Sequence, residues 1–176
     1  IALFDLDGVG KSPSRFDMKK LEHLNGHYLR EADDARLAAL VAARIGEGAD
    51  EALLTQAMPV LKVRAKNLNE VVEGAAFLFA KRPLAMTEKA AQLLEGDARA
   101  ILRQIYERLR AENDWTSETL EATTKALAEE LGLGLGKLAQ PMRAALTGTT
   151  TSPGIFDVLV LLGRDEALAR LDAQAA

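Results

Sequence analysis

Aliphatic residues recur with a period near 3.6 along almost the whole chain of 176 residues, which is the spacing of one face of an α-helix. The clearest case lies in residues 98–109, where the apolar positions are Ala98, Ile101, Leu102, Ile105, Tyr106 and Leu109. The opposite side of this segment carries three arginines, Arg99, Arg103 and Arg110. The pattern therefore predicts a helix with one stripe in a core and one solvated face.

Similar patterns predict helices through the rest of the chain, and no segment has the alternation of a convincing strand. The expected helices span about 17–31, 34–45, 50–65, 69–81, 87–95, 116–131, 137–147, 153–162 and 164–174. Residues suited to capping a helix N-terminus are Asp17, Asp50, Thr87, Thr116 and Ser152. The sequence as a whole predicts an all-α fold.

Residues 156–162 (FDVLVLL) are ambiguous, because their β-branched residues would also suit a buried strand. Ser152 and Pro153 favour a helix, since serine is a common N-cap and proline a common first helical residue. Gly163 stands where such a helix would end. We therefore expect a helix over 153–162 that is apolar nearly all round and buried, with a core strand as the alternative.

A boundary between two consecutive helical bundles is expected at residues 81–87 (KRPLAMT), where a proline interrupts the helical pattern and a new N-cap follows. The first bundle would span 31–86 and the second 87–176, with residues 1–30 preceding both.

Composition excludes several classes of protein. The chain has no cysteine and two histidines, so disulfides and cysteine metal sites are excluded. No apolar run approaches the roughly 20 residues of a membrane span, and we expect a soluble, cytoplasmic protein cut from a longer chain. The formal net charge is −4, so any nucleic-acid site must be a local one.

Residues 8–12 (GVGKS) resemble part of a phosphate-binding loop. The full motif needs a glycine where Asp5 stands, and Pro13 disturbs the helix start that would follow. A nucleotide hydrolase using Lys11 and Ser12 is therefore disfavoured against a simple loop.

His23 and His27 lie four residues apart, a spacing that can place two metal ligands on one helix face. No third ligand is evident, so a solvent-facing or hydrogen-bonded pair is the favoured interpretation. The sequence shows no complete set of catalytic residues.

The most informative segment surrounds Arg143, which precedes a hydroxyl-rich stretch, residues 147–152 (TGTTTS). A guanidinium can pair with a base edge or stack on it, while hydroxyls and helix N-terminal N–H groups can bind phosphate or ribose. These parts suit an anion or an unstacked base. The alternative is a threonine-rich loop that only joins two helices.

Arg64 belongs to a second cationic segment, with Lys62 and Lys66 on either side. Three cations at the end of a helix offset its dipole, so a role in stability is sufficient to explain them. A local basic patch is the functional interpretation.

Six segments, read in order, carry a family resemblance: GKSPSRFD (10–17), KLEHLNGHYLR (20–30), RAKNL (64–68), ENDWT (112–116), GKLAQPMRAALTG (136–148) and SPGIF (152–156). Together they resemble the part of bacterial glutamyl-tRNA synthetases that follows the catalytic domain. The resemblance covers nearly the entire chain, and the combination is more specific than any one segment.

The resemblance implies a class I, ATP-dependent glutamate-tRNA ligase of translation. Full-length members use ATP and Mg²⁺ in an N-terminal Rossmann domain with HIGH and KMSKS-type signatures, which are absent here. The chain would comprise the end of the stem-contact region (1–30) and two anticodon-binding helical subdomains (31–86 and 87–176). We expect it to bind tRNA(Glu) as a monomer, without cofactor, metal, DNA or membrane, and not to aminoacylate alone.

The resemblance also implies roles for individual residues. Arg64 matches the arginine that reads the third anticodon base and is associated with rejecting the glutamine tRNA. Arg143 matches the arginine that contacts the first anticodon bases. The residues expected to pack around the first base are Ser152, which replaces a threonine of some members, Pro153 and Ile155. Contacts with the tRNA stem or backbone are expected from Lys11, Ser12 and Lys66.

A competing hypothesis is an all-helical protein-interaction module without RNA binding, which the absence of a basic net charge would favour. Salt separates the two hypotheses, because binding through several phosphates weakens steeply as salt rises, whereas an apolar interface barely responds.

Overall fold

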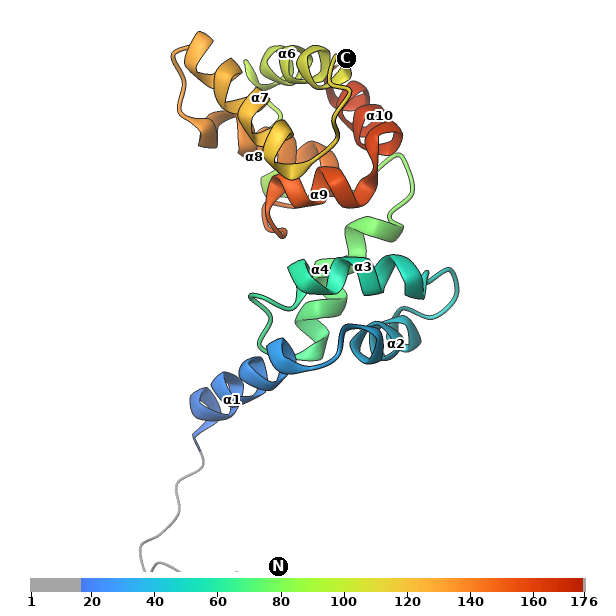
Figure 1. The fold of residues 1–176 in the computed structure, drawn as a ribbon. Helices are drawn as coiled ribbons and strands as arrows, with labels where there is room; N and C mark the ends of the chain where they lie inside the picture. The colour runs from blue at the N-terminus through green and yellow to red at the C-terminus, as the bar shows by residue number, and fades with distance from the viewer. Residues whose placement is uncertain (1–16, 176) are drawn as a thin grey trace, which may run out of the picture.

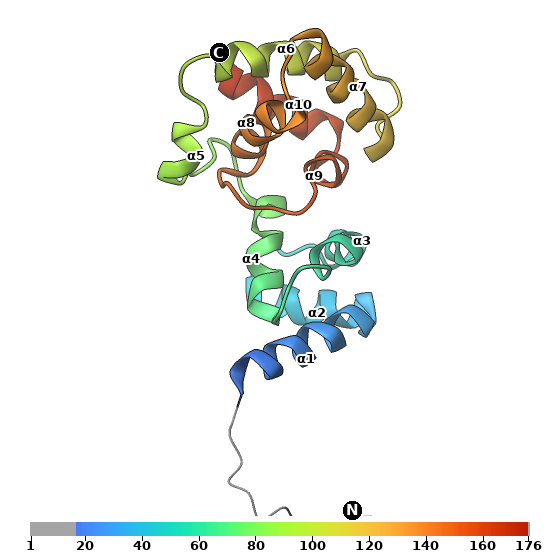
Figure 2. The same cartoon turned by 90° about the vertical axis from the view of Figure 1, so that its left-hand side faces the viewer.

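A computed structural model describes residues 17–175, and in this range the chain forms ten α-helices and no β-strand (Figure 1). The predicted all-α fold class is confirmed. The helices form two groups stacked end to end, with α4 leading from one group toward the other (Figure 2).

The first group holds four helices. Their bounds are α1 Met18–Glu31, α2 Asp34–Ile45, α3 Glu51–Leu61 and α4 Leu68–Phe79. Helices α2 and α3 lie side by side, and both pack against α4. Their buried side chains, such as Val41, Leu54 and Met58, form one end of the core.

The second group holds the remaining helices of the described range. Their bounds are α5 Glu88–Gln92, α6 Ala98–Arg110, α7 Ser117–Glu130, α8 Leu135–Thr147, α9 Ile155–Leu162 and α10 Arg164–Ala175. Helix α10 packs along α6 and also contacts α8 and α9, while α7 covers α6, α8 and α9. Helix α3 contacts α9, which joins the two groups.

The α6 helix shows why the sequence pattern was informative. Leu102, Ile105 and Leu109 are buried, whereas Arg103 and Arg110 lie on the exposed side as predicted. Each fully buried leucine contributes about 1.5–3 kcal/mol relative to an exposed one, so this stripe is enough to hold the helix in place.

Side-chain caps confirm four of the five predicted helix starts. Asp17, Asp50, Thr87 and Thr116 each accept a hydrogen bond from the first turn of the helix that follows, as when Asp50 Oδ1 accepts from the Leu53 N–H at 2.9 Å. Such caps contribute about 1 kcal/mol each.

Ser152 does not cap a helix, so the fifth prediction is wrong. Helix α9 begins at Ile155 with Gly154 as its N-cap. The Ser152 hydroxyl instead contacts Arg143 and donates to the Pro153 carbonyl at 2.9 Å, so it is not available to the helix. The helix itself is confirmed over the strand alternative, although Val160 is 39% exposed and the segment is not buried all round.

Helix α3 is shorter than the predicted 50–65 and ends at Leu61. The next residue, Lys62, forms an ion pair with Asp34 at 2.6 Å and donates to the Ala32 carbonyl at 2.9 Å. This contact with the start of α2 holds the chain as it turns away from the helix axis. Arg64 therefore lies beyond the helix, in residues 62–67, which we call the Arg64 turn.

The segment between α4 and α5 is attached to the second group at Gly148. The Thr87 N–H donates to the Gly148 carbonyl at 2.9 Å. Gly148 has a φ of 72°, and a Cβ at this position would lie 2.3 Å from the Ala85 carbonyl oxygen. Only glycine fits such a backbone conformation and such a close approach.

Candidate RNA-binding site

Arg143 lies one turn before the end of α8 and holds the loop of residues 148–154 that leads to α9. Its Nη1 atom donates to the Pro153 carbonyl at 2.7 Å and to the Ser152 carbonyl at 3.2 Å, and it also contacts the Ser152 hydroxyl. Among residues 17–175 the hydrogen bonds of this guanidinium all leave from Nη1, so Nε and Nη2 have no protein acceptor there. Arg143 therefore orders the loop with one nitrogen and keeps two donors for a ligand.

Arg64 follows helix α3 in the first group of helices, and Arg143 lies on helix α8 in the second. Burial lowers the pKa of the Arg143 guanidinium below its usual value, and the positive charge of Arg64 lowers it further. The two like charges repel each other, and a bound anion would relieve this repulsion. The two arginines are candidates for the local cationic site that a protein of net charge −4 would need in order to bind an anion.

The Arg64 turn is fixed from both sides. The Asn25 side-chain amide, on α1, donates to the Lys66 carbonyl at 2.6 Å. On the α4 side, a carboxylate oxygen of Glu70 accepts from the Lys66 backbone N–H at 2.8 Å. Both backbone groups of Lys66, two residues after Arg64, are in this way bonded to neighbouring helices, and the Arg64 side chain of this turn is exposed.

Gly26 explains why α1 can approach this turn. A Cβ at Gly26 would lie 3.3 Å from the Ala65 carbonyl oxygen, closer than side chains ordinarily come. Gly26 is buried although most of α1 is exposed. The two residues of the LNG sequence, Asn25 and Gly26, therefore dock α1 onto the Arg64 turn.

The threonines after Arg143 are engaged with one another and with the backbone. Thr147 Oγ1 donates to the Arg143 carbonyl at 2.8 Å and accepts from the Thr149 N–H at 3.3 Å. Thr149 Oγ1 donates to the Thr151 carbonyl at 2.7 Å. These bonds fold the loop into a defined shape, while Thr151 itself is exposed.

The start of α9 differs from the expected anion site. Ile155 is only 5% exposed, so its side chain belongs to the core. The carboxylate of Asp157 lies over the helix start, since a Cβ at Gly154 would meet its Oδ2 atom at 2.3 Å. A negative charge at this position already complements the helix dipole and would repel a phosphate. A carboxylate therefore already lies at this helix start, and the expectation that its N–H groups receive an anion stays a prediction.

Lys66 is exposed and near the cationic pair in sequence, but its Nζ atom also lies 3.8 Å from a carboxylate oxygen of Glu22. At this distance, and with both side chains largely exposed, the ion pair is weak. Lys66 remains accessible to an anion. Lys11 and Ser12 lie outside the described residues.

The described residues contain no group of three histidine, cysteine, aspartate or glutamate side chains that could hold a metal ion. His23 and His27 are both exposed on α1. Within the same residues, no helix is long and apolar enough to cross a membrane.

Sequence reasoning singled out Arg64, Arg143, Ser152 and Pro153, and the structure places Ser152 and Pro153 in contact with Arg143. It missed the residues that bond the Arg64 turn and the segment beside Gly148. Asn25 and Gly148 act through contacts with segments distant in the sequence, and Glu70 acts through a bond to Lys66, four residues before it. The only signal in the sequence was their place inside segments of the family resemblance or next to one.

Residues 29–175 match the family described as the anticodon binding domain. The chain is 77% identical over 175 residues to glutamate-tRNA ligase 1 of Erythrobacter litoralis and 64% identical over 183 residues to glutamate-tRNA ligase 2 of Novosphingobium aromaticivorans. These alignments cover 99% and 100% of this chain, but 36% and 38% of the relatives.

A solved structure shows the same fold. The crystal structure of a glutamate tRNA ligase from Elizabethkingia meningosepticum, in complex with its amino acid, superposes with a TM-score of 0.81 at 24% identity. The superposition covers 98% of this chain and 35% of that one. The chain belongs to the anticodon binding domain family, and it spans a little over a third of the length of the glutamate-tRNA ligases that it resembles. A general protein-interaction module is therefore not favoured.

Proposed function

We propose that this chain is the anticodon-binding part of a glutamate-tRNA ligase and binds the anticodon of tRNA(Glu) at the face formed by Arg64 and Arg143. The observation that carries the proposal is the geometry of Arg143, whose Nη1 atom bonds the 148–154 loop while its Nε and Nη2 atoms lack a protein acceptor among residues 17–175. The charge of Arg64, from the other helix group, acts on this guanidinium and lowers its pKa. The glutamate-tRNA ligases among its relatives supply the identity of the RNA.

Recognition would begin when the anticodon bases leave their stack, because sequence-specific proteins read RNA mainly through unstacked loop bases. The Nε and Nη2 donors of Arg143 form a fork that matches two acceptors on one base edge. Meanwhile its Nη1 bonds keep the 148–154 loop, including Ser152 and Pro153, in one shape beside that base. The loop is therefore already ordered in the free protein, so RNA binding does not carry the entropy cost of ordering it.

Arg64 would read a different base from the other side, since its turn is held by α1 and α4 rather than by α8. An arginine there donates to the acceptor pattern of a guanine or pairs with a phosphate. The family resemblance assigns it to the third anticodon base, where it would disfavour the glutamine tRNA. Lys11, Ser12 and Lys66 would add contacts to the tRNA backbone.

The remaining parts of the proposal concern the whole protein. The first subdomain would span 31–86 and the second 87–176, with residues 1–30 ending the stem-contact region. ATP, Mg²⁺ and glutamate would be handled by a catalytic domain outside this chain, which itself would need no cofactor. We place the protein in the cytoplasm as a monomer that binds neither DNA nor membranes.

The test is a titration of the chain with unmodified transcripts of tRNA(Glu) and tRNA(Gln) at two salt concentrations. We expect tighter binding of the glutamate transcript and a steep loss of affinity between about 50 and 200 mM salt. The Arg143→Ala variant should lose most of this binding. Equal affinities for both transcripts, insensitive to salt and to Arg143→Ala, would contradict the proposed function.

A further inference from the structure

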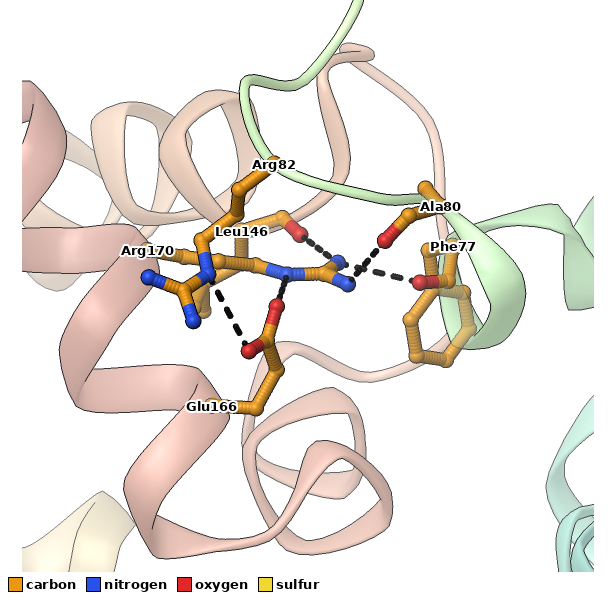
Figure 3. A network of polar contacts seen from close by, with 6 residues as sticks. All are labelled: Phe77, Ala80, Arg82, Leu146, Glu166 and Arg170. Carbon is orange, nitrogen blue, oxygen red and sulfur yellow. Dashed lines mark hydrogen bonds and ion pairs between the residues drawn. The ribbon is translucent and has the colours of Figure 1, made fainter.

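Arg170, on α10, is the most deeply buried charged side chain of the described residues, with 2% exposure. Its Nη1 atom donates to the Phe77 carbonyl at 3.0 Å and to the Leu146 carbonyl at 2.7 Å, and its Nη2 atom donates to the Ala80 carbonyl at 2.8 Å (Figure 3). One guanidinium thus reaches three backbone carbonyls that are distant in sequence.

The three carbonyls belong to the ends of two helices. Phe77 and Ala80 close α4, and Leu146 lies in the last turn of α8. The last carbonyl oxygens of a helix accept no hydrogen bond from within the helix, and they carry the negative end of the helix dipole. A cation placed between two such ends is favourable to both, so Arg170 joins the C-terminal ends of α4 and α8.

The charge of Arg170 is balanced by a carboxylate. Glu166 Oε1 accepts from Arg170 Nε at 2.7 Å, and Glu166 Oε2 accepts from Arg82 Nε at 3.2 Å (Figure 3). Arg82 belongs to the segment that connects the two helix groups. The network therefore ties α10 to both helix ends and to the connection between them.

Both proposed anticodon arginines depend on these helices. Arg143 lies one turn before Leu146 on α8, and the Arg64 turn leads directly into α4 at Leu68. Helix α4 has 12 residues and is about 18 Å long. A tilt of about 10° at its C-terminal end would move its other end by about 3 Å, enough to break a bidentate contact.

We propose that Arg170 is a positioning residue of the anticodon site, which sets the separation of Arg64 and Arg143 by locking the ends of α4 and α8 together. The inference rests on the proposed function. Arg170 itself is buried and does not touch RNA.

The first measurement needs no RNA. Because the chain has no cysteine, spin labels can be placed at Ala43→Cys on α2 and Ala126→Cys on α7, both exposed positions. Pulsed electron–electron double resonance then gives the distribution of distances between the two labels, one on each helix group. We expect a narrow distribution for the parent chain and a broader one for Arg170→Lys, since an ammonium lacks the planar fork that reaches several acceptors. An unchanged distribution would overturn the inference.

The second measurement is the affinity for the tRNA(Glu) transcript at a temperature where circular dichroism shows both proteins folded. Arg170→Lys keeps the charge, so a loss of roughly 3- to 30-fold reports position rather than electrostatics. Arg103→Lys is the matched control, because Arg103 forms an exposed ion pair with Asp172 of the same α10 helix at 2.8 Å. It should leave affinity unchanged. A purely structural role of Arg170 would lower the melting temperature and leave the affinity of the folded chain intact, which would also overturn the inference.

If Arg170→Lys does not fold, Glu166→Gln loosens the same network from its partly exposed side, and we expect the same two changes at smaller size. An unchanged distance distribution in that variant would overturn the inference. Arg64→Ala and Arg143→Ala, measured beside these, test the proposed function separately. If neither substitution weakens binding, the proposed anticodon site is refuted, and the proposed role of Arg170 in that site is refuted with it.

Discussion

Replacing Arg64 by glutamine should change stability and RNA binding in opposite directions. In the free chain the Arg64 charge lowers the pKa of Arg143, which means that the two cations repel each other. Because Arg64 is exposed, solvent screens this repulsion, and its removal should stabilise the chain by about 0.2–1 kcal/mol. For a protein of this size that raises the melting temperature by roughly 0.4–4 °C.

In the complex the same change removes a contact to the RNA. A bidentate arginine-base pair contributes about 1–3 kcal/mol of discrimination, so affinity for the tRNA(Glu) transcript should fall by about 5- to 150-fold. The preference over the glutamine transcript should fall with it. The assays are thermal unfolding of the free chain and titration with both transcripts.

Arg44→Gln is the matched control, because it removes the same charge from an exposed position on α2, away from the Arg64 turn. In the parent chain Arg44 Nη1 donates to the Leu40 carbonyl at 3.3 Å in the last turn of the helix, so losing this bond should make Arg44→Gln slightly less stable. Its affinity for RNA should equal that of the parent chain. If Arg64→Gln instead destabilised the free chain, or weakened RNA binding no more than Arg44→Gln, the reasoning about the cationic pair would be refuted.

Three further substitutions test other contacts. Arg143→Ala should weaken tRNA binding by at least about tenfold without loss of helix content by circular dichroism, and unchanged affinity would remove Arg143 from the site. Gly148→Ala should lower the unfolding free energy by about 2 kcal/mol or more, measured in urea, because its Cβ would approach the Ala85 carbonyl oxygen at a positive φ; an unaltered midpoint would contradict this. Trp115→Phe should cost about 1 kcal/mol, since it removes the 3.0 Å bond from Nε1 to the Leu159 carbonyl, and a stability equal to that of the parent would show that the bond is not needed.

The helices were predictable because their determinants are local. Residue spacing in α6 fixed the buried stripe, and aspartates or threonines at helix starts formed the caps that their chemistry favours. Both signals come from residues within one or two turns of each other.

Predictions failed where a distant residue competed for a local signal. Ser152 has the chemistry of an N-cap, but its hydroxyl contacts Arg143, which the sequence pattern does not show. Helix α3 ends early beside the Lys62 contact with Asp34, a residue of another helix. Such long-range competition cannot be derived from spacing alone.

The same distinction applies to the candidate site. Arginines and hydroxyls that suit RNA could be recognised by type, and the family resemblance selected Arg64 and Arg143 among many cations. Helix α3 packs against α9, while Asn25 and Glu70 bond the Arg64 turn and Arg170 bonds the ends of α4 and α8. Nothing in the sequence pattern distinguishes these three residues from other polar residues on helices, and their contacts become visible only in the fold.

The most direct test compares the tRNA(Glu) transcript with the same transcript whose three anticodon bases have been replaced. Both RNAs carry the same phosphates, so the comparison isolates base reading from charge. If Arg64 and Arg143 read the anticodon, the replaced transcript should bind at least about tenfold more weakly to the parent chain, and this difference should disappear in the Arg64→Ala, Arg143→Ala double variant. Equal affinities of the parent chain for the two transcripts would contradict anticodon recognition at this face.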